Sequence, residues 1–391
     1  MRRIHCLNNI SPLGTALLTE GYALSDTFEG ADGALVRSAS LHDVELPESL
    51  LAIARAGAGV NNIPLERCAE AGIVVFNTPG ANANAVKELV ICALLLGSRD
   101  IAGGIAWCRD NADDENIAKA AEKAKKAFSG REIAGKKLGV IGLGAIGAEV
   151  ANAAVGLGMD VYGYDPYVSV GAAWRISSAV HHVTNLDDVL RVCDYLTIHV
   201  PATDSTKGMI DARACSLMKD GAVFLNFSRD SLVDDEAMAA ALSSGKVAVY
   251  VTDFANPAVM RMEHAVVLPH LGASTAEAED NCAVMAVREL MDYLDNGTIA
   301  NSVNYPACDL GPVPEGLRRV AVLHENVPNA LARITNVFGD AGVNIENMAN
   351  KSRGEAAYTL LDLDAGAAGW PDDAVCRLAA LEGVRRVRVV K

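Results

Sequence analysis

Residues 138–147 read LGVIGLGAIG, an apolar run that leads directly into glycines at positions 142, 144 and 147. The residues that follow, AEVANAAVGLG, have a helical pattern. In a strand–turn–helix unit the first glycine permits a tight turn, the second lets the backbone approach a pyrophosphate, and the third lets the helix pack on the strand. The helix N-terminus then faces the anion. The segment therefore predicts a dinucleotide-binding loop, with contacts from Gly142, Gly144, Ala145, Ile146 and Gly147.

Asp165 lies about 20 residues after this loop, at the end of the predicted strand MDVYGYD (residues 159–165). A carboxylate at that place accepts hydrogen bonds from an adenosine ribose and repels a 2′-phosphate. Asp165 therefore favours NAD over NADP as the cofactor. The alternative is that Asp165 and Pro166 only form the turn that ends a strand.

Outward from the loop, short apolar runs alternate with helical stretches in two series. The first series begins near residue 34, with ALVRS, LLAIARAG, IVVFN and the long helical AVKELVICALLLGSRDIAGGI (residues 85–105). The second begins at the glycine loop and continues through YLTIHV, AVFLNFS, AVYVTDF and AVVLPH. Continuous apolar runs of this length are typical of parallel strands that are buried on both faces. The fold class is therefore α/β, with two Rossmann-like doubly wound parallel-sheet domains.

The C-terminal part has a different pattern. Residues 302–319, SVNYPACDLGPVPEGLRR, hold three prolines and two glycines without periodicity and indicate a linker. From Arg318 the order βαββαβ predicts a small α+β ferredoxin-like domain. Before the linker, residues 274–297 predict one long helix, which Ser274 and Glu277 would open as a capping box. We expect a substrate-binding domain over 1–98 and 285–307, a nucleotide-binding domain over 99–284 and a regulatory domain over 318–391.

Composition and charge exclude several classes of function. The formal net charge of −15 argues against a broad basic face for nucleic acid or for an anionic membrane. The nine cysteines are scattered singly, so no metal is expected. The N-terminal MRRIHCLNNI lacks the apolar core of a signal peptide, and the longest apolar run, residues 89–97, is shorter than the ~20 residues of a membrane span. We expect a cytoplasmic protein.

Two further strand ends carry polar side chains of catalytic type. Arg229 lies in NFSRDSLVD, directly after the strand AVFLN, and His270 lies in PHLG after the strand AVVL. Ligands of open α/β sheets bind at the carboxyl ends of strands, and histidine can act as a base near neutral pH. Either residue alone is more often structural. Beside a dinucleotide loop, the pair indicates hydride transfer, which needs an anion-binding group and a base.

With these motifs the chain resembles the D-2-hydroxy-acid dehydrogenase family over most of residues 34–305. The resemblance implies an NAD-dependent enzyme in which Arg229 holds the substrate carboxylate and His270 is the acid/base. It implies that Asp253 contacts the nicotinamide carboxamide. It places Val200, Pro201 and Phe227 along the cofactor.

The chain departs from the family pattern beside the catalytic histidine. The family usually has a Glu just before a Pro in this segment, which holds and stabilises the histidine, whereas the chain has Asn256 before Pro257. An amide can orient a ring nitrogen but does not stabilise an imidazolium as a carboxylate does. Either His270 works with a less elevated pKa, or another carboxylate, such as Glu263, reaches it.

The first domain carries Arg37 in VRSAS and Arg55 in RAGAGVNN, each at a strand end. Two guanidinium groups suit a phosphate, because bidentate charge-assisted contacts are the strong ones. Here the resemblance is to the members of the family that act on 3-phosphoglycerate. It implies that Arg37 and Arg55 contact the phosphate, that the backbone of Ala58 and Gly59 meets the carboxylate, and that Asn82 also contacts the substrate. The expected reaction is the oxidation of 3-phospho-D-glycerate to 3-phosphohydroxypyruvate, the first step of the phosphorylated route to L-serine.

Other interpretations stay open. Either arginine could form a surface ion pair. The chain could be a reductase of another 2-keto acid, such as hydroxypyruvate. It could also be a catalytically inactive NAD-sensing binding protein.

The C-terminal domain resembles an ACT domain, a ligand-binding module that usually pairs side by side across a dimer. The resemblance rests on His324-Glu325-Asn326, the helical NALARITNVFGDAG and Val343-Asn344-Ile345. It implies that His324, Asn326 and Asn344 bind L-serine as an effector, in a homodimer or homotetramer. The alternative is that this domain only dimerises the enzyme.

Overall fold

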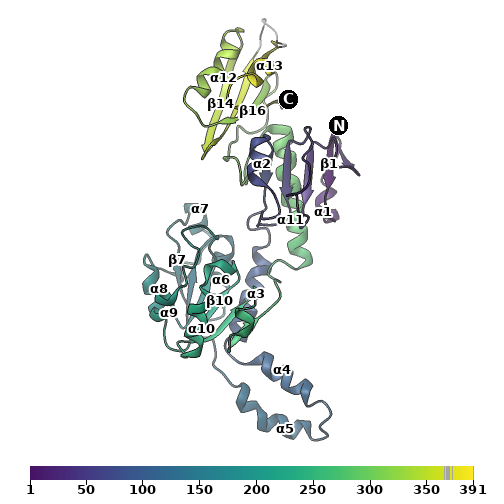
Figure 1. The fold of residues 1–391 in the computed structure, drawn as a ribbon. Coiled ribbons are helices and arrows are strands. Elements are labelled where there is room, and N and C mark those ends of the chain that lie inside the picture. Colours follow the sequence, from purple (N-terminus) through teal and green to yellow (C-terminus); the bar gives the residue numbers. More distant parts are fainter. Residues whose placement is uncertain (365, 367–369, 372, 391) are drawn as a thin grey trace. The chain divides into compact units, whose positions relative to one another are not determined.

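The computed structural model describes residues 1–364, 366, 370–371 and 373–390. The chain forms two compact units: the first unit comprises residues 1–81 and 279–391, and the second unit residues 82–278 (Figure 1). The three domain boundaries expected from the sequence stay a prediction. Of the expected regulatory domain, residues 365, 367–369, 372 and 391 lie outside the described residues.

The first unit contains a five-stranded parallel sheet in the order β2-β1-β3-β4-β5. All residues of β3 and β5 are buried, as the apolar runs predicted. The strands β1 and β2 were not predicted, because only Ile4 among their residues is buried and the rest are half-buried or exposed. The elements are β1 (Arg2–Cys6), α1 (Pro12–Thr15), β2 (Tyr22–Ser25), β3 (Gly33–Val36), β4 (Ala52–Arg55), α2 (Leu65–Glu70), β5 (Val74–Phe76) and α11 (Ala276–Asn296), which enters this unit at residue 279.

The second unit contains a seven-stranded parallel sheet in the order β12-β11-β10-β9-β6-β7-β8. Its first strand, β6, lies between β7 and β9, so the chain order reverses there and the loops after β6 and β9 diverge. The two predicted parallel sheets are thus confirmed. The strands are β6 (Lys137–Ile141), β7 (Asp160–Tyr164), β8 (His181–His182), β9 (Tyr195–Ile198), β10 (Ala222–Asn226), β11 (Val247–Thr252) and β12 (Ala265–Val267).

The second unit also contains helices. They are α3 (Ala83–Leu96), α4 (Ile101–Asp110), α5 (Ile117–Ala124), α6 (Ala145–Gly156), α7 (Val170–Ala173), α8 (Leu186–Val192), α9 (Ala212–Leu217) and α10 (Asp235–Ser243), with the short 3-10 helices η1 (Lys125–Phe128), η2 (Asp230–Leu232) and η3 (Val259–Arg261). The helical stretch expected over residues 85–105 is broken between α3 and α4. The break follows Gly97, where a Cβ would lie 2.6 Å from Val223 Cγ1, and Asp100 begins α4 by accepting a hydrogen bond from Gly103 N. Among the described residues no single helix has the length and hydropathy of a membrane span; α3 and α4 together would pass, but they are bent by 72°.

The long helix α11 was predicted correctly but begins differently. The Thr275 hydroxyl accepts a hydrogen bond from Ala278 N at 3.1 Å, so the residue that caps the helix is Thr275 and not Ser274. The end at Asn296 with Gly297, whose φ is +75°, agrees with the sequence pattern.

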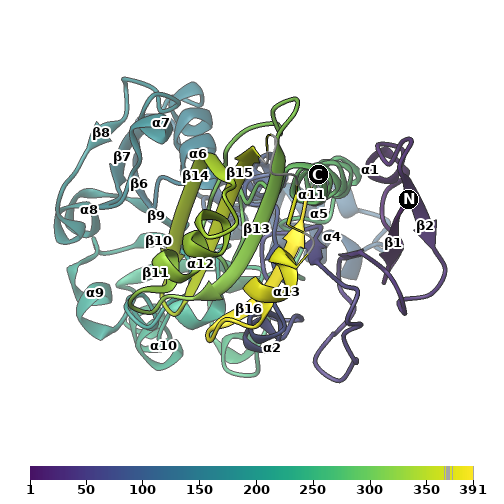
Figure 2. The same ribbon diagram turned by 90° about the horizontal axis from the view of Figure 1, so that it is seen from above.

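The ferredoxin-like domain is confirmed for its described residues. Four antiparallel strands lie in the order β14-β15-β13-β16. Figure 2 shows α12 and α13 over one face of this sheet, where Val320, Val322, Phe338 and Leu361 are buried together. The elements are β13 (Arg318–Glu325), α12 (Ala330–Gly339), β14 (Asn344–Arg353), β15 (Ala356–Asp364), α13 (Ala374–Ala379) and β16 (Val384–Val389).

The other face of this small sheet is also covered. Leu323 and Tyr358 belong to the same buried core as Phe76 and Tyr293 of the five-stranded part. The segment expected as a linker has irregular backbone, as predicted, but Tyr305 within it is fully buried in that core. In the first unit the small sheet is therefore packed on its neighbours and is not a loosely tethered module.

Candidate active site

The glycine loop has the geometry that the sequence predicted. Gly142 has a φ of +92°, and a Cβ there would lie 2.5 Å from His199 O. A Cβ on Gly147 would lie 1.9 Å from Gly142 O, so only glycine lets α6 approach the strand so closely. A Cβ on Gly144 would meet nothing within 4 Å, which leaves open space above the loop. A tight turn at Gly142, open space at Gly144 and close helix packing at Gly147 are the features that a dinucleotide loop requires.

Helix α6 begins at this loop with Gly144 as its N-cap and without a side-chain cap. Its first amides and the positive end of its dipole can therefore bind a pyrophosphate. Asp165 is tied to the same loop, since its Oδ2 accepts a hydrogen bond from Leu143 N at 2.9 Å. Its Oδ1 accepts one from Tyr167 N at 2.8 Å, so Asp165 also holds the turn at the end of β7. Each carboxylate oxygen has a second lone pair for a ribose hydroxyl, and the residues of this site fit NAD.

The loop after β9 borders the glycine loop. Val200 Cγ1 lies 2.9 Å from where a Cβ on Gly142 would be. Pro201 O accepts a hydrogen bond from the Thr206 hydroxyl at 2.6 Å. Phe227, expected along the cofactor, is 6% exposed and lies in the hydrophobic core with Leu143.

His199 is a polar residue of this region that sequence reasoning did not single out. Its Nε2 is 3.0 Å from the Thr197 hydroxyl, whereas its Nδ1 is buried without a partner. Burial lowers the pKa of His199 to about 3, so the ring is neutral. The sequence signal that could have identified His199 is its position, directly after a buried strand and before Val200.

Arg229 is held by a buried network of backbone and side-chain hydrogen bonds. Asn226 is fully buried, and its Nδ2 donates to Arg229 O at 2.8 Å. The Ser228 hydroxyl donates to Ile198 O at 2.9 Å, and the Thr252 hydroxyl donates to Asn226 O at 2.9 Å. The network fixes the backbone at the end of β10 while the Arg229 side chain stays exposed.

His270 lies in the same unit, after β12. It is exposed, and its ring centroid is 5.0 Å from that of Phe254 in a tilted arrangement. Asp253, next to Phe254, is 2% exposed and accepts a hydrogen bond from Gly272 N at 3.2 Å. Burial raises the pKa of Asp253, and the nearby charge of His270 opposes that rise.

The side-chain hydrogen bonds of Asn256 go to residues other than His270. Asn256 Nδ2 donates to Asp235 Oδ2 at 3.0 Å, and its Oδ1 accepts from Ala258 N and Val259 N at 2.9 and 2.8 Å. The amide oxygen therefore starts the turn before η3, and the amide nitrogen binds Asp235. The proposed contact of Glu263 with His270 stays a prediction.

Arg37 and Arg55 lie side by side in the first unit. Arg55 ends β4 opposite Val36 of β3, and its Nε donates to Arg37 O at 3.2 Å. The Arg37 side chain is 43% exposed and forms an ion pair with Glu279 of α11. The alternative that an arginine here forms an ion pair thus holds for Arg37. The two arginines still lie at the ends of neighbouring strands. Glu279 was not foreseen, because it is 242 residues away in the chain.

The loop after β4 is anchored by residues that follow β5. Gly57 has a φ of +150° and its N–H donates to the Thr78 hydroxyl at 2.8 Å. Asn77 Nδ2 donates to Ala58 O at 2.6 Å, which fixes the backbone that continues to Gly59. Asn82 belongs to the second unit, where it precedes α3, and its Oδ1 is buried without a partner.

The three candidate effector residues do not meet in one chain. His324 pairs with Ala357 of β15, whereas Asn344 pairs with Asp364 of the same strand. At about 3.3 Å per residue, the two positions lie about 23 Å apart along the sheet. Asn326 lies near His324, and its Nδ2 donates to Gly354 O at 3.2 Å.

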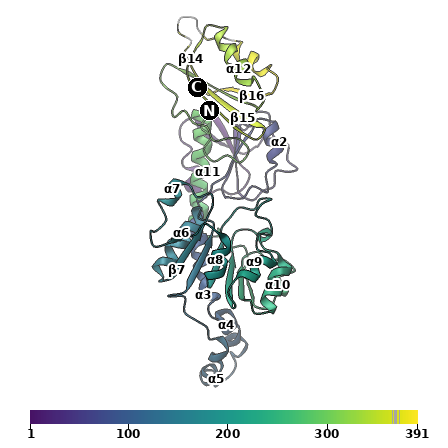
Figure 3. The same cartoon turned by 90° about the vertical axis from the view of Figure 1, so that its left-hand side faces the viewer.

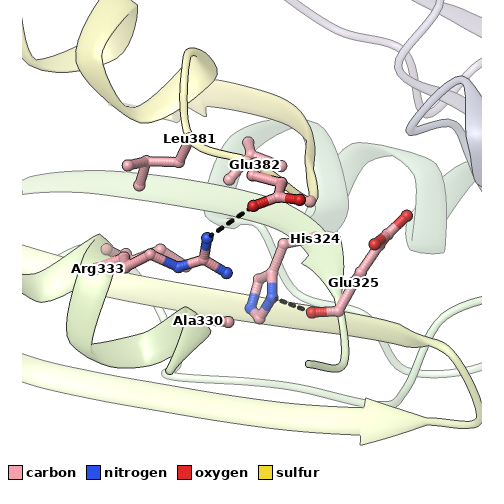
Figure 4. A pocket seen from close by; sticks show the side chains of 9 residues that line it. His324, Glu325, Ala330, Arg333, Leu381 and Glu382 are labelled. Atoms are coloured by element: carbon pink, nitrogen blue, oxygen red, sulfur yellow. Dashed lines mark hydrogen bonds and ion pairs between the residues drawn. The ribbon is translucent and has the colours of Figure 1, made fainter. Parts of the chain in front are cut away.

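His324 lines a small pocket with Arg333 and Glu382, whose side chains are 3.7 Å apart (Figure 4). Its Nδ1 is 2.8 Å from Glu325 O and its Nε2 is 2.9 Å from the Thr359 hydroxyl, so both ring nitrogens have partners. Burial lowers the pKa of His324, which keeps the imidazole neutral at physiological pH. Among the described residues no group of three or more His, Cys, Asp or Glu side chains could hold a metal ion.

Comparison with known proteins supports one family throughout. Residues 95–272 match the D-isomer specific 2-hydroxyacid dehydrogenase, NAD binding domain. The chain is 34% identical to D-3-phosphoglycerate dehydrogenase of Escherichia coli strain K12 and 31% identical to that of Haemophilus influenzae, covering 89% of this chain and 83% of each relative. It is similar to the NAD⁺-bound structure of 3-phosphoglycerate dehydrogenase from Entamoeba histolytica, with a TM-score of 0.61, 25% identity and coverage of 78% of this chain and 98% of the other.

Proposed function

The chain belongs to the family of D-isomer specific 2-hydroxyacid dehydrogenases, and on that premise we propose that it oxidises 3-phospho-D-glycerate to 3-phosphohydroxypyruvate with NAD. The names of the relatives support the substrate. The observation that carries the proposal is the pair Arg37 and Arg55 at the ends of neighbouring strands, because a phosphate dianion suits two adjacent guanidinium groups. The reaction would be the first step of the phosphorylated route to L-serine.

The chain's own residues then have separate tasks. Gly142, Gly144 and the amides of α6 hold the pyrophosphate of NAD, and Asp165 holds the ribose. Bound NAD supplies the acceptor for the hydride. Arg229 binds the substrate carboxylate and polarises the oxygen at C2, while His270 takes the proton of the hydroxyl group.

The direct test is the formation of NADH from 3-phospho-D-glycerate by the purified chain. For Arg55→Ala we expect KM for this substrate to rise roughly 10- to 100-fold, since a charge-assisted hydrogen bond contributes about 1.5–3 kcal/mol. kcat/KM for unphosphorylated D-glycerate should change far less. Arg288→Ala, an exposed arginine of α11 in the same unit, is the matched control and should behave as wild type.

Three results would contradict the proposal in different ways. Equal losses on both substrates would remove the phosphate role of Arg55. Faster reduction of hydroxypyruvate than of its phosphorylated counterpart would indicate a reductase of another 2-keto acid. NAD binding without turnover of any 2-hydroxy acid would indicate a binding protein.

We propose further that the chain forms a homodimer or homotetramer through α4, α5 and η1. These elements project from the rest of the second unit (Figures 1 and 3), and neither α4 nor α5 has a buried residue. An open apolar groove between them is lined by Ile101, Ile105, Trp107 and Phe128. A projecting helical pair with an uncovered apolar face needs a partner to be stable, and a second copy supplies one.

For Ile105→Asp, at a side chain that is 51% exposed, we expect the oligomer to dissociate into smaller species. Light scattering coupled to gel filtration measures the mass. Lys119→Glu, on an exposed position of α5 outside the groove, is the control and should keep the wild-type mass. An unchanged mass for Ile105→Asp would place the interface elsewhere.

With this geometry, His324, Asn326 and Asn344 can bind L-serine together only if two copies of the chain form the site. Since His324 and Asn344 are far apart in one chain, we propose that His324 and Asn326 of one copy meet Asn344 of another, and that serine replaces one internal bond of His324. Calorimetry should detect serine binding to wild type and none to His324→Ala or Asn344→Ala. Co-assembled oligomers of the two variants should regain part of the binding capacity, because one intact site can form. Wild type that does not bind serine would leave the domain with a structural role only.

The cellular location is proposed as the cytoplasm. All nine cysteines are free thiols, and several are buried singly in the cores. Unpaired thiols fit a reducing compartment.

A further inference from the structure

We propose that Asp253 is the carboxylate partner of His270, a positioning residue that stabilises the protonated imidazole. The inference rests on the proposed role of His270 as the acid/base. It differs from the role that the family resemblance gives Asp253, which is contact with the cofactor alone.

The first observation is the environment of Asp253. Its side chain is 2% exposed, at the end of β11, and its Oδ1 is buried without any hydrogen-bond partner. Its Oδ2 accepts one bond, from Gly272 N at 3.2 Å. A buried carboxylate oxygen without a donor is costly, so such an oxygen usually serves a nearby cation or donor.

The second observation connects this carboxylate to His270. Asp253 Oδ2 accepts a hydrogen bond from the backbone N–H of Gly272, two residues after His270. The residue after Asp253, Phe254, packs its ring on the His270 ring at 5.0 Å between centroids. Asp253 and Phe254, consecutive residues after β11, thus contact the backbone of Gly272 and the ring of His270.

The third observation concerns the other charged groups of this region. Asp235 is engaged with Asn256, and Asn256 also caps the turn before η3. Glu263 and His264 are exposed, on the segment between η3 and β12. Burial raises the pKa of the Asp253 carboxyl, and the positive charge of His270 lowers it, as expected for two groups that attract each other.

The pair explains how His270 can work without a glutamate at position 256. Taking the hydroxyl proton turns the imidazole into an imidazolium, and a buried anion stabilises that charge more than a solvated one does. The attraction is reciprocal, because each group shifts the proton affinity of the other by the same free energy.

The test is the titration of His270, followed by NMR of ¹³C-labelled histidine in the full chain without substrate. For Asp253→Asn, which can still accept the bond from Gly272 N, we expect the NMR titration of His270 to move to lower pH than in wild type. Asp235→Asn, which removes another carboxylate of the second unit, is the control and should leave that titration unchanged. The acid limb of the kcat/KM profile should move in the same direction as the NMR titration.

A second variant keeps the inference testable if Asp253→Asn fails to fold. His270 is exposed, so His270→Asn should fold, and we expect the carboxyl titration of Asp253 to move to higher pH when the imidazolium is gone. An unchanged His270 titration in Asp253→Asn together with a higher KM for NAD would overturn the inference and leave Asp253 as a cofactor contact. Both titrations are measured without turnover, so they are separate from any failure of the proposed reaction.

Discussion

His270→Gln lowers kcat for the oxidation of 3-phospho-D-glycerate by about 10²- to 10⁴-fold, the contribution of a positioned general acid/base. The glutamine keeps a polar group of similar reach at the end of β12 but cannot take the hydroxyl proton. The stability of the chain should not change, because His270 is exposed and its described contact is the ring of Phe254. Steady-state kinetics and thermal unfolding measure the two effects.

Binding of NADH separates a chemical defect from a structural one. Its Kd, followed by fluorescence, should stay within about threefold of wild type, because the glycine loop and Asp165 are untouched. His182→Gln, at an exposed histidine of β8 in the same unit, is the control and should keep full activity. Activity close to wild type in His270→Gln would mean that another group takes the proton.

The parts of the fold that sequence predicted well are those in which one physical demand dominates. Strands buried on both faces, such as β10 and β9, are short continuous apolar runs between turn signals, which is the pattern expected of a parallel sheet. The glycine loop was predicted because each glycine answers a separate steric demand. The structure shows the demands at Gly142 and Gly147, and it leaves open space at Gly144. In contrast, β1 has a single buried residue, so its burial left little periodic signal.

The parts that were not predicted depend on contacts between distant residues. Asn256 stands at the place where a partner of His270 was expected, yet its recorded hydrogen bonds go to a local turn and to Asp235. The ion pair of Arg37 with Glu279 joins a strand end to a helix far along the chain. A sequence gives the residue types of such pairs but not which of many possible partners the packing selects.

The second face of the small C-terminal sheet did leave a signal. A ferredoxin-like sheet with helices on one face should alternate buried and exposed residues on its strands. Eight of the nine residues of β15 are buried instead, and β13 has six consecutive buried residues. The apolar parts of AAYTLLDLD and RRVAVLHE therefore carried evidence that both faces are covered, whereas the burial of Arg319 was not expected from its residue type.

Asp362→Asn should reduce the free energy of unfolding of the first unit by about 3–5 kcal/mol, the cost of leaving a buried charge without its partner. Arg319 and Asp362 are 0% and 1% exposed and form two parallel bonds, Nε to Oδ1 at 2.6 Å and Nη2 to Oδ2 at 2.9 Å. Arg319 Nη1 also donates to Asn296 O at the end of α11. The substituted amide keeps the size of the side chain but loses the charge, so the guanidinium stays buried and uncompensated.

Urea unfolding with a probe in the first unit measures this loss, since a chain of two units need not unfold in one step. The double variant Arg319→Met with Asp362→Leu removes both charges, and we expect it to be markedly more stable than Asp362→Asn, because well-packed apolar pairs often match a buried ion pair. Asp340→Asn, in an ion pair of the first unit with Arg377 that leaves the Asp340 side chain 74% exposed, is the control and should change stability by less than about 1 kcal/mol. A loss in Asp362→Asn no larger than in this control would show that the buried pair contributes nothing beyond its hydrogen bonds. A large loss of stability in Asp362→Asn that the double variant recovers would instead show that the buried charge of Arg319 must be neutralised. Since Arg319 also bonds the end of α11, the docking of the small sheet would then be an integral part of the fold of the first unit.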